Sequence, residues 1–380
     1  MKPATTYPER RDDVRLLVID PTLPTLPKLP TAPAQAALRE TRTPALADFL
    51  AAGDLLVVND AATVPASLRG RDAAGNEIEA RLIAARGDDR FGAVLFGAGD
   101  WHQRTEDRPP PAPLPVGARV RFGALAAELV ARADASPRLV ELRFDAAGDA
   151  LWAALYREGR PVQYSYLAHD LPLWAVQTVY AARPWAFEMP SAGRPLSWEI
   201  LLALRRKGVR WASLTHAAGL SATGDPAIDA GLPLAERFEI PPATVHAVAE
   251  ARARGGRVVA VGTTVVRALE GAAARNAGVL RAGPGETDLV ITPAFRPRVV
   301  DGILSGAHAA HESHFSLLAA FAGPELLAAA ATHAERAGFL THELGDSMLV
   351  LPGALAGAAP VRGELRAASQ SPTGAWPARA

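Results

Sequence analysis

The 380-residue chain contains no cysteine. Disulfides, thiolate nucleophiles, cysteine-bound zinc and cysteine-held iron–sulfur clusters are therefore excluded. Lysine is also scarce, because Lys2, Lys28 and Lys207 are the only lysines among 40 basic residues. The positive charge is consequently carried almost entirely by guanidinium groups, whose planar fork suits carboxylates and phosphates.

The chain also lacks net charge and long hydrophobic runs. Its 40 basic residues balance 40 acidic ones, which argues against a protein that coats polyanions but leaves room for a local basic face. No uncharged, proline-free apolar stretch approaches the roughly 20 residues that span a bilayer, and the N-terminus has no secretory apolar region. We therefore expect a cytoplasmic protein that does not enter a membrane. Separately, we expect it to be a monomer.

The pattern of apolar residues changes along the chain. Residues 63–150 contain short alternating runs separated by Gly, Asp and Pro, which predicts a small β-barrel or sandwich. Beyond residue 195, strands predicted at 209–215, 257–261, 288–291 and 347–351 alternate with helices predicted at 197–207, 242–254, 264–276 and 324–336. This alternation is typical of a mostly parallel sheet with helices on both faces.

An apolar strand at 54–58 precedes the β-rich region. The economical interpretation is an α/β protein, a three-layer αβα sandwich interrupted by an inserted β-barrel. The predicted parts are a proline-rich surface arm (1–45), the sandwich (46–62 and 151–352), the barrel (63–150) and a loose tail (353–380).

The sharpest local pattern is the run Val-Gly-Thr-Thr-Val-Val-Arg at 261–267. Gly262 ends an apolar strand, and Thr263 and Thr264 open a helix whose free backbone N–H groups suit an anion or a polar nucleoside edge. Arg267 lies one turn further on and could reach the same place. The alternative is that a threonine only caps the helix and Arg267 is a solvated charge.

Polar residues also follow other predicted strands. Asn59 and Asp60 close the strand at 54–58, and His216 closes the strand at 209–215. Ligands of parallel sheets gather beyond the carboxyl ends of strands, so these side chains are candidate contacts. An Asx turn and an ordinary hydrogen-bonded histidine are the alternatives. Ser191 and Gly193 lie in a loop that suits close approach of a ligand to the backbone.

Three histidines follow one another at helical spacing: His308, His311 and His314. On one helix they would be close enough to share a metal. However, Gly302 and Gly306 argue against a helix that reaches back to His308, and the His-Glu-x-x-His pattern is absent. We predict no metal site, and a metal-dependent hydrolase remains a distant alternative.

Taken together, several segments resemble the S-adenosylmethionine:tRNA ribosyltransferase-isomerase family of queuosine biosynthesis. The resemblance extends over residues 46–351, and the most specific block is Gly-Gly-Arg-Val-Val-Ala-Val-Gly-Thr-Thr-Val-Val-Arg at 255–267. Further matching segments lie at 53–60, 177–180, 285–288, 301–308, 321–323 and 345–348.

The resemblance implies an αβα sandwich with an inserted barrel and a defined reaction. The ribosyl part of S-adenosylmethionine is transferred to a 7-aminomethyl-7-deazaguanine base in tRNA and rearranges to epoxyqueuosine, while adenine and methionine leave. S-adenosylmethionine is a substrate, tRNA is the partner, and no metal or bound redox cofactor is needed.

The resemblance and the local patterns together suggest roles for particular residues. His216 and His308 are candidates for proton transfer, and Asp288 or Asp60 for contact with the sulfonium or the ribose hydroxyls. Arg267 is the candidate partner of the methionine carboxylate. The full predicted site comprises catalytic His216, His308 and Asp288, with substrate contacts at Asn59, Asp60, Gln177, Ser191, Gly193, Gly262, Thr263, Thr264, Arg267 and Asp301.

The chain departs from the family pattern at presumed substrate contacts. Ala62 and Ser67 stand where arginines are usual, and Pro195 stands where a histidine is usual. These differences keep two alternatives open. One is an offshoot that acts on another nucleoside acceptor, and the other is a catalytically silent protein that binds a nucleotide or tRNA.

Overall fold

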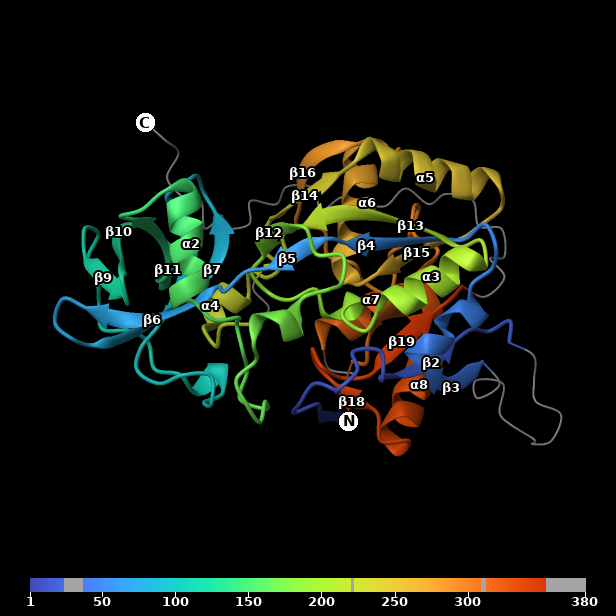
Figure 1. The fold of residues 1–380 in the computed structure, drawn as a ribbon, viewed down its shortest axis with the longest axis horizontal. Helices are drawn as coiled ribbons and strands as arrows, with labels where there is room; N and C mark the ends of the chain where they lie inside the picture. The colour runs from blue at the N-terminus through green and yellow to red at the C-terminus, as the bar shows by residue number, and fades with distance from the viewer. Residues whose placement is uncertain (24–36, 220–221, 309–311, 353–380) are drawn as a thin grey trace.

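The computed structural model describes residues 1–23, 37–219, 222–308 and 312–352. A closed β-barrel lies at one end of the molecule, and a large mixed sheet flanked by helices lies at the other (Figure 1). The expected tail at 353–380 falls outside the described residues. Within the described residues, no helix is long and apolar enough to cross a membrane.

The large sheet has nine strands in the order β16-β14-β13-β4-β15-β17-β19-β2-β3. Its four central strands, β13, β4, β15 and β17, are parallel, whereas antiparallel pairs occur towards both edges. The strand bounds are β2 Arg15–Ile19, β3 Leu38–Arg42, β4 Leu55–Asn59, β13 Arg210–His216, β14 Glu236–Ile240, β15 Val258–Val261, β16 Gly283–Thr287, β17 Gly302–Gly306 and β19 Ser347–Val350.

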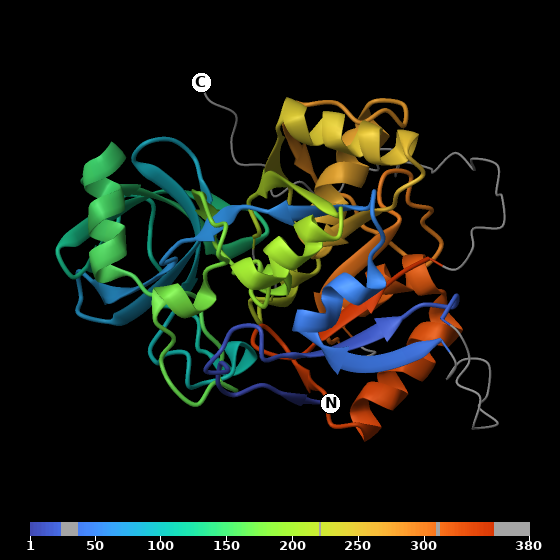
Figure 2. The same cartoon turned by 45° about the vertical axis from the view of Figure 1, so that its right-hand side comes forward.

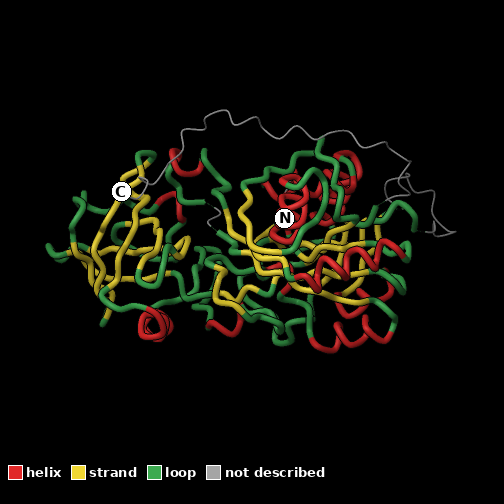
Figure 3. The backbone as a smooth tube through the Cα atoms, turned by 90° about the horizontal axis from the view of Figure 1, so that it is seen from above, coloured by secondary structure: helices red, strands yellow, loops and turns green. Residues whose placement is uncertain are grey.

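Alternate residues of the central strands face two different helical layers. Leu55 and Val57 of β4 pack with α5, α6, α7 and α8, whereas Leu56 and Val58 pack with α3 and the 3₁₀ helix η1. Because neighbouring side chains of a strand point to opposite faces, a continuous apolar run requires cover on both sides. Figure 3 shows helices above and below the sheet, and the two sets of contacts confirm the predicted three-layer α/β architecture.

The helices begin and end close to the positions predicted from their capping residues. Ser197 caps α3 by accepting from the Ile200 N–H, and Gly208, with φ +87°, follows its last turn. The bounds are η1 Thr43–Phe49, α2 Gly148–Glu158, η3 Leu173–Val176, η4 Ser191–Gly193, α3 Trp198–Arg206, α4 Pro226–Asp229, α5 Pro242–Ala253, α6 Thr263–Arg275, α7 Ser313–Ala322 and α8 Pro324–Arg336, with a short 3₁₀ turn η2 at Thr105–Asp107.

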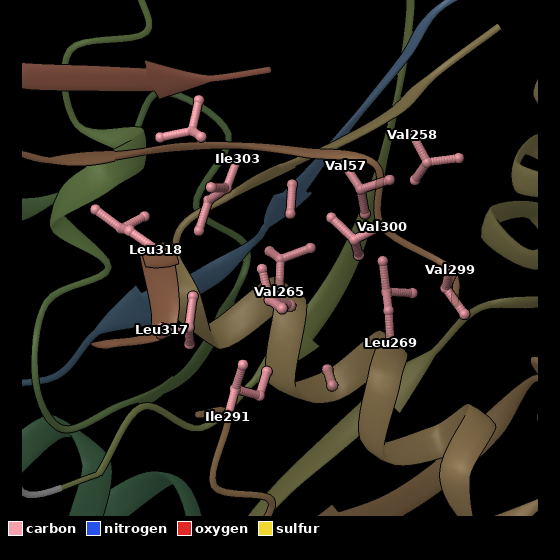
Figure 4. Packing of buried hydrophobic residues seen from close by; sticks show 14 of the residues in the cluster. Val57, Val258, Val265, Leu269, Ile291, Val299, Val300, Ile303, Leu317 and Leu318 are labelled. Atoms are coloured by element: carbon pink, nitrogen blue, oxygen red, sulfur yellow. The ribbon is translucent and has the colours of Figure 1, made fainter. Parts of the chain in front are cut away.

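Helix α6 buries eight of its 13 residues. Val265 and Leu269 are fully buried and pack against Val57, Val258 and Ile303 of the parallel strands (Figure 4). This packing holds the first turn of α6 at a defined position above the end of β15.

The barrel closes in the order β10-β11-β8-β7-β6-β9. Helix α2 packs Leu151 and Leu155 into its core, so the domain boundary expected at residue 150 falls inside a helix that belongs to the barrel. The barrel strands are β6 Ser67–Asp72, β7 Glu77–Ala85, β8 Arg90–Phe96, β9 Arg119–Phe122, β10 Leu125–Ala133 and β11 Ser136–Phe144. Two small parallel pairs complete the fold: β1 Lys2–Pro3 with β18 Leu340–Thr341, and β5 Ala61–Thr63 with β12 Arg183–Ala186.

Two predictions about elements are wrong. The described residues of the predicted arm at 1–45 do not form a surface arm, because they include the sheet strands β2 and β3, as Figure 2 shows, and β2 is almost wholly buried. Residues 288–291 are not a strand either, since β16 ends at Thr287 and pairs with β14 at the sheet edge.

A candidate site at the carboxyl edge of the parallel strands

Four parallel strands end side by side at one edge of the large sheet. β13 ends at His216, β4 at Asn59, β15 at Val261 and β17 at Gly306. The predicted residues that follow these strands, including Asp60, Gly262 and His308, therefore lie along this same edge.

Helix α6 begins directly at this edge. Gly262 has φ +91° and ψ 157°, a conformation that suits glycine, and it turns the chain from β15 into the helix. No side chain of the described residues caps the helix, so the first-turn N–H groups at Thr263 and Thr264 face the carboxyl edge. Helix N-termini attract anionic and polar groups.

The loop that contains η4 closes over this helix terminus. A Cβ added to Gly262 would lie 3.4 Å from the Cβ of Ala192, so the Ser191–Gly193 turn contacts the start of α6. A Cβ on Gly193 would lie 2.1 Å from the Tyr180 hydroxyl, which explains why only glycine fits there. The structure thus brings Ser191 and Gly193 together with Gly262.

Asn59 and Asp60 are held by hydrogen bonds to neighbouring strands. The Asn59 amide donates to the His216 carbonyl at 3.0 Å, accepts from the His216 N–H at 2.9 Å, and lies 3.5 Å from Thr264 Oγ1. The Asp60 carboxylate accepts from the Ser213 hydroxyl at 2.9 Å and from the Thr215 hydroxyl at 2.6 Å. Asn59 is therefore firmly positioned next to the α6 terminus, whereas the Asp60 carboxylate is held against β13.

Arg267 points to a different set of partners. It forms an ion pair with Glu236, and it also donates to the Leu289 carbonyl at 3.1 Å and the Thr287 carbonyl at 3.5 Å. Because Nε and both terminal nitrogens are engaged, Arg267 anchors the chain around 287–289 instead of presenting a free guanidinium to the site.

His216 is fully buried. Its Nε2 lies 3.4 Å from Glu236 Oε2, yet neither ring nitrogen has a hydrogen-bond partner among the described residues. Burial, assisted by the positive charge of Arg267, lowers the pKa of His216 to about 3. A ring that is neutral at physiological pH and has no access to solvent does not fit the expected proton transfer.

His308 retains suitable geometry for proton transfer. Its Nε2 lies 3.0 Å from the Ser305 hydroxyl, its Nδ1 lies 2.9 Å from the Glu312 carboxylate, and its side chain is 13% exposed. His314 contacts the ring at 4.8 Å between centroids, whereas His311 lies outside the described residues. Within the described part of the chain, no group of three His, Asp or Glu side chains could hold a metal.

Three other predicted site residues either lie away from this edge or form hydrogen bonds that hold the backbone. The Gln177 amide pairs with the backbone N–H and carbonyl of Thr63 at 2.9 and 2.8 Å. Asp288 is 77% exposed at the surface, 3.8 Å from Arg275 near the far end of α6. Asp301 accepts from the Val258 N–H at 2.8 Å, where β15 and β17 begin, at the opposite edge of the sheet.

The sequence patterns missed an ionisable pair where the barrel meets the sandwich. The Tyr164 hydroxyl donates to Glu188 Oε1 at 2.6 Å, and the Glu188 N–H donates to the Ala218 carbonyl, two residues past the end of β13. Burial raises the pKa of Glu188 to about 7, although the Tyr164 hydrogen bond and the Arg81 charge oppose this shift. The one sequence feature that could have indicated this pair is the acidic residue Glu188, which lies shortly before the Ser-Ala-Gly turn.

The fold and this edge define an α/β protein with an inserted barrel, whose candidate ligand site combines a helix N-terminus with nearby acid–base groups. A family model described as "Queuosine biosynthesis protein" matches residues 2–350. The chain belongs to this family, that of the S-adenosylmethionine:tRNA ribosyltransferase-isomerases.

Individual relatives are similar over most of their length. A protein from Sorangium cellulosum named S-adenosylmethionine:tRNA ribosyltransferase-isomerase is 36% identical over 367 residues, covering 91% of this chain and 94% of its own. One of the same name from Gloeobacter violaceus is 36% identical over 314 residues, covering 81% and 85%. A crystal structure of S-adenosylmethionine tRNA ribosyltransferase from Thermotoga maritima matches 92% of this chain and 96% of its own, at 24% identity and a TM-score of 0.48.

Proposed function

We propose that this protein transfers the ribosyl part of S-adenosylmethionine to a 7-aminomethyl-7-deazaguanine base in tRNA, with isomerisation to epoxyqueuosine. The observation that carries the proposal is the agreement of named relatives at about 36% identity across nearly the whole of both chains. Adenine and methionine are the other products.

The carboxyl edge supplies the binding groups that this reaction needs. The N–H groups of the first α6 turn, beside Gly262, hold polar groups of the nucleoside. Asn59 lies next to this turn. Asp60, the following residue, is held by β13 at the same edge, and its carboxylate supplies negative charge that stabilises the sulfonium cation of the substrate. Rigid strands hold these groups in place, so little ordering is required when the substrate binds.

Proton transfer requires a group that titrates near neutral pH. Glu188 fits a general base that removes a proton at C5′, because its pKa of about 7 lets it accept a proton under working conditions. His308, oriented by Ser305 and Glu312, is the second candidate for moving a proton at the opposite side of the same edge. His216 serves as a buried structural residue instead.

The direct test incubates the purified protein with S-adenosylmethionine and with tRNA that carries the 7-aminomethyl-7-deazaguanine precursor, and measures free adenine and methionine. We expect release of both that depends on the precursor tRNA. If the protein binds neither substrate and releases neither product, the proposed substrates are wrong.

The departures from the family pattern support a second candidate, an offshoot that uses another acceptor. Pro195 is buried where the family usually has a histidine, so any contact of that imidazole with the substrate is lost. Ser67, at a usual arginine position, instead donates to Glu79 inside the barrel at 2.9 Å. Adenine release that proceeds equally without tRNA would favour this offshoot over the main proposal.

A further inference from the structure

Arg194 is a buried cation that has no anionic partner in the described part of the chain. The residue is 3% exposed, and its Nε and Nη2 atoms have no hydrogen-bond partner among the described residues. Other buried arginines are better satisfied. Arg81 and Arg108 both bind the Glu79 carboxylate, and Arg138 donates to the carbonyls of Leu95 and Thr223.

A second arginine lies beside it. Arg11 Nη1 donates to the Arg194 carbonyl at 3.5 Å and to the Gln177 carbonyl at 3.0 Å. Burial, and then the positive charge of Arg11, lower the pKa of Arg194 to about 10, and no carboxylate contributes an opposing effect. Two neighbouring cations in a partly dehydrated place are unfavourable unless an anion joins them.

The surrounding side chains add a further unpaired hydrogen-bonding group. The Thr178 hydroxyl is buried and has no partner among the described residues. Thr178 packs against the turn that precedes Arg194, because a Cβ on Gly193 would lie 3.3 Å from its Cγ2. A hydroxyl can donate to an anionic oxygen, so it complements the two guanidinium groups.

The position of Arg194 connects it with the candidate site. Ala192, two residues earlier, contacts Gly262 at the start of α6, and two residues of chain span at most about 7 Å. Arg267, the residue expected to receive a carboxylate, is already paired with Glu236. Among the described residues, Arg194 is therefore an incompletely paired guanidinium whose backbone lies close to the carboxyl edge, within reach of an anionic part of the substrate.

We propose that Arg194, with Arg11 and Thr178, forms an anion subsite that binds a carboxylate or phosphate of the substrate. The inference rests on the proposed function, which offers two sources: the methionine carboxylate of S-adenosylmethionine and a phosphate of tRNA. The depth of Arg194 favours the carboxylate, because a small group can enter a buried subsite more readily than an RNA backbone can.

The test compares wild type with Arg194→Met, which removes the charge but retains length, and with Arg194→Lys, which retains a charge. Binding is measured by calorimetry for S-adenosylmethionine, for its decarboxylated analogue and for tRNA. We expect Arg194→Met to weaken S-adenosylmethionine binding by about 10- to 100-fold, with little change for the analogue. Arg194→Lys should recover part of the loss. Arg10→Met, at a 74% exposed arginine of the neighbouring segment, is the matched control.

The other outcomes separate the sources and the hypotheses. A loss confined to tRNA, with a shallower salt dependence, supports the subsite with phosphate as its occupant. Equal losses for S-adenosylmethionine and its decarboxylated analogue, or no loss for any ligand, overturn it. If wild type binds neither substrate, the proposed function fails. In that case the subsite is tested with inorganic phosphate and acetate. A rise in Tm for wild type but not for Arg194→Met supports the subsite, and the absence of that difference overturns it.

Discussion

At the scale of single residues, the interior of this protein shifts the pKa values of its ionisable groups in both directions. Burial raises the pKa of Glu188 to about 7 and lowers that of His216 to about 3. The Glu188 carboxyl group thus changes its protonation state near neutral pH, whereas the His216 imidazole does not. Residue type alone suggests the reverse assignment, since histidine ordinarily titrates near neutrality.

Glu188→Gln should lower kcat by about 10²- to 10⁴-fold, the usual contribution of a general base. In wild type, kcat/KM should rise as the pH increases through about 7, because the base must be deprotonated. Tyr164→Phe provides a sharper readout. Its hydrogen bond lowers the pKa of Glu188, so its removal should move the profile to higher pH. An unchanged profile in both variants would exclude Glu188 as the base.

His216 should make stability depend on pH. Its folded pKa lies below the ordinary value of 6.5, so the unfolded chain takes up a proton first as the pH falls. The stabilising contribution is complete above pH 6.5 and is lost between 6.5 and about 3. Denaturant titrations at pH 7.5 and 5 should show a smaller acid-induced loss in His216→Gln than in wild type. Equal losses in both would contradict this account.

At the scale of elements, the η4 turn depends on a close approach between Gly193 and Tyr180. Gly193→Ala places a methyl group 2.1 Å from the Tyr180 hydroxyl, so we expect it to cost about 1–3 kcal/mol of unfolding free energy. The double variant with Tyr180→Phe should recover much of that loss, because the clashing oxygen is gone. Purely additive effects in denaturant unfolding would show that the contact does not control the turn.

Individual elements also show which features of the fold are readable from sequence. The bounds of α8 were predicted correctly, because Pro324 opens the helix and its apolar periodicity is regular. β2 and β3 were missed because the proline-rich segment between them suggested an extended arm. The strand β16 was predicted too far along the chain, because its Gly-Pro-Gly sequence lacks the apolar character of a buried strand.

The candidate site was partly predictable for similar reasons. Residues that end parallel strands, such as Asn59 and Gly262, share an edge through a general property of such sheets. The partners of Arg267, the burial of His216 and the pair of Tyr164 with Glu188 depend on contacts between distant segments. No local pattern encodes those contacts.

At the scale of the whole molecule, the zero net charge conceals an uneven distribution. Residues 191–300 carry 14 basic and nine acidic side chains, whereas residues 301–350 carry one basic and six acidic. Binding of tRNA should therefore weaken as salt rises from 50 to 200 mM, but by less than the roughly 10³-fold typical of proteins with many phosphate contacts. Filter-binding measurements test this, and affinity independent of salt would argue against a basic docking face.

Transfer of a ribosyl group from S-adenosylmethionine to tRNA can be followed directly in the modified nucleoside. The most direct measurement supplies S-adenosylmethionine labelled in its ribose, together with precursor-containing tRNA, and analyses the digested tRNA nucleosides by mass spectrometry. We predict an epoxyqueuosine nucleoside that carries the ribose label, formed in step with free adenine. Unmodified precursor after complete reaction time, with intact S-adenosylmethionine, would contradict the account.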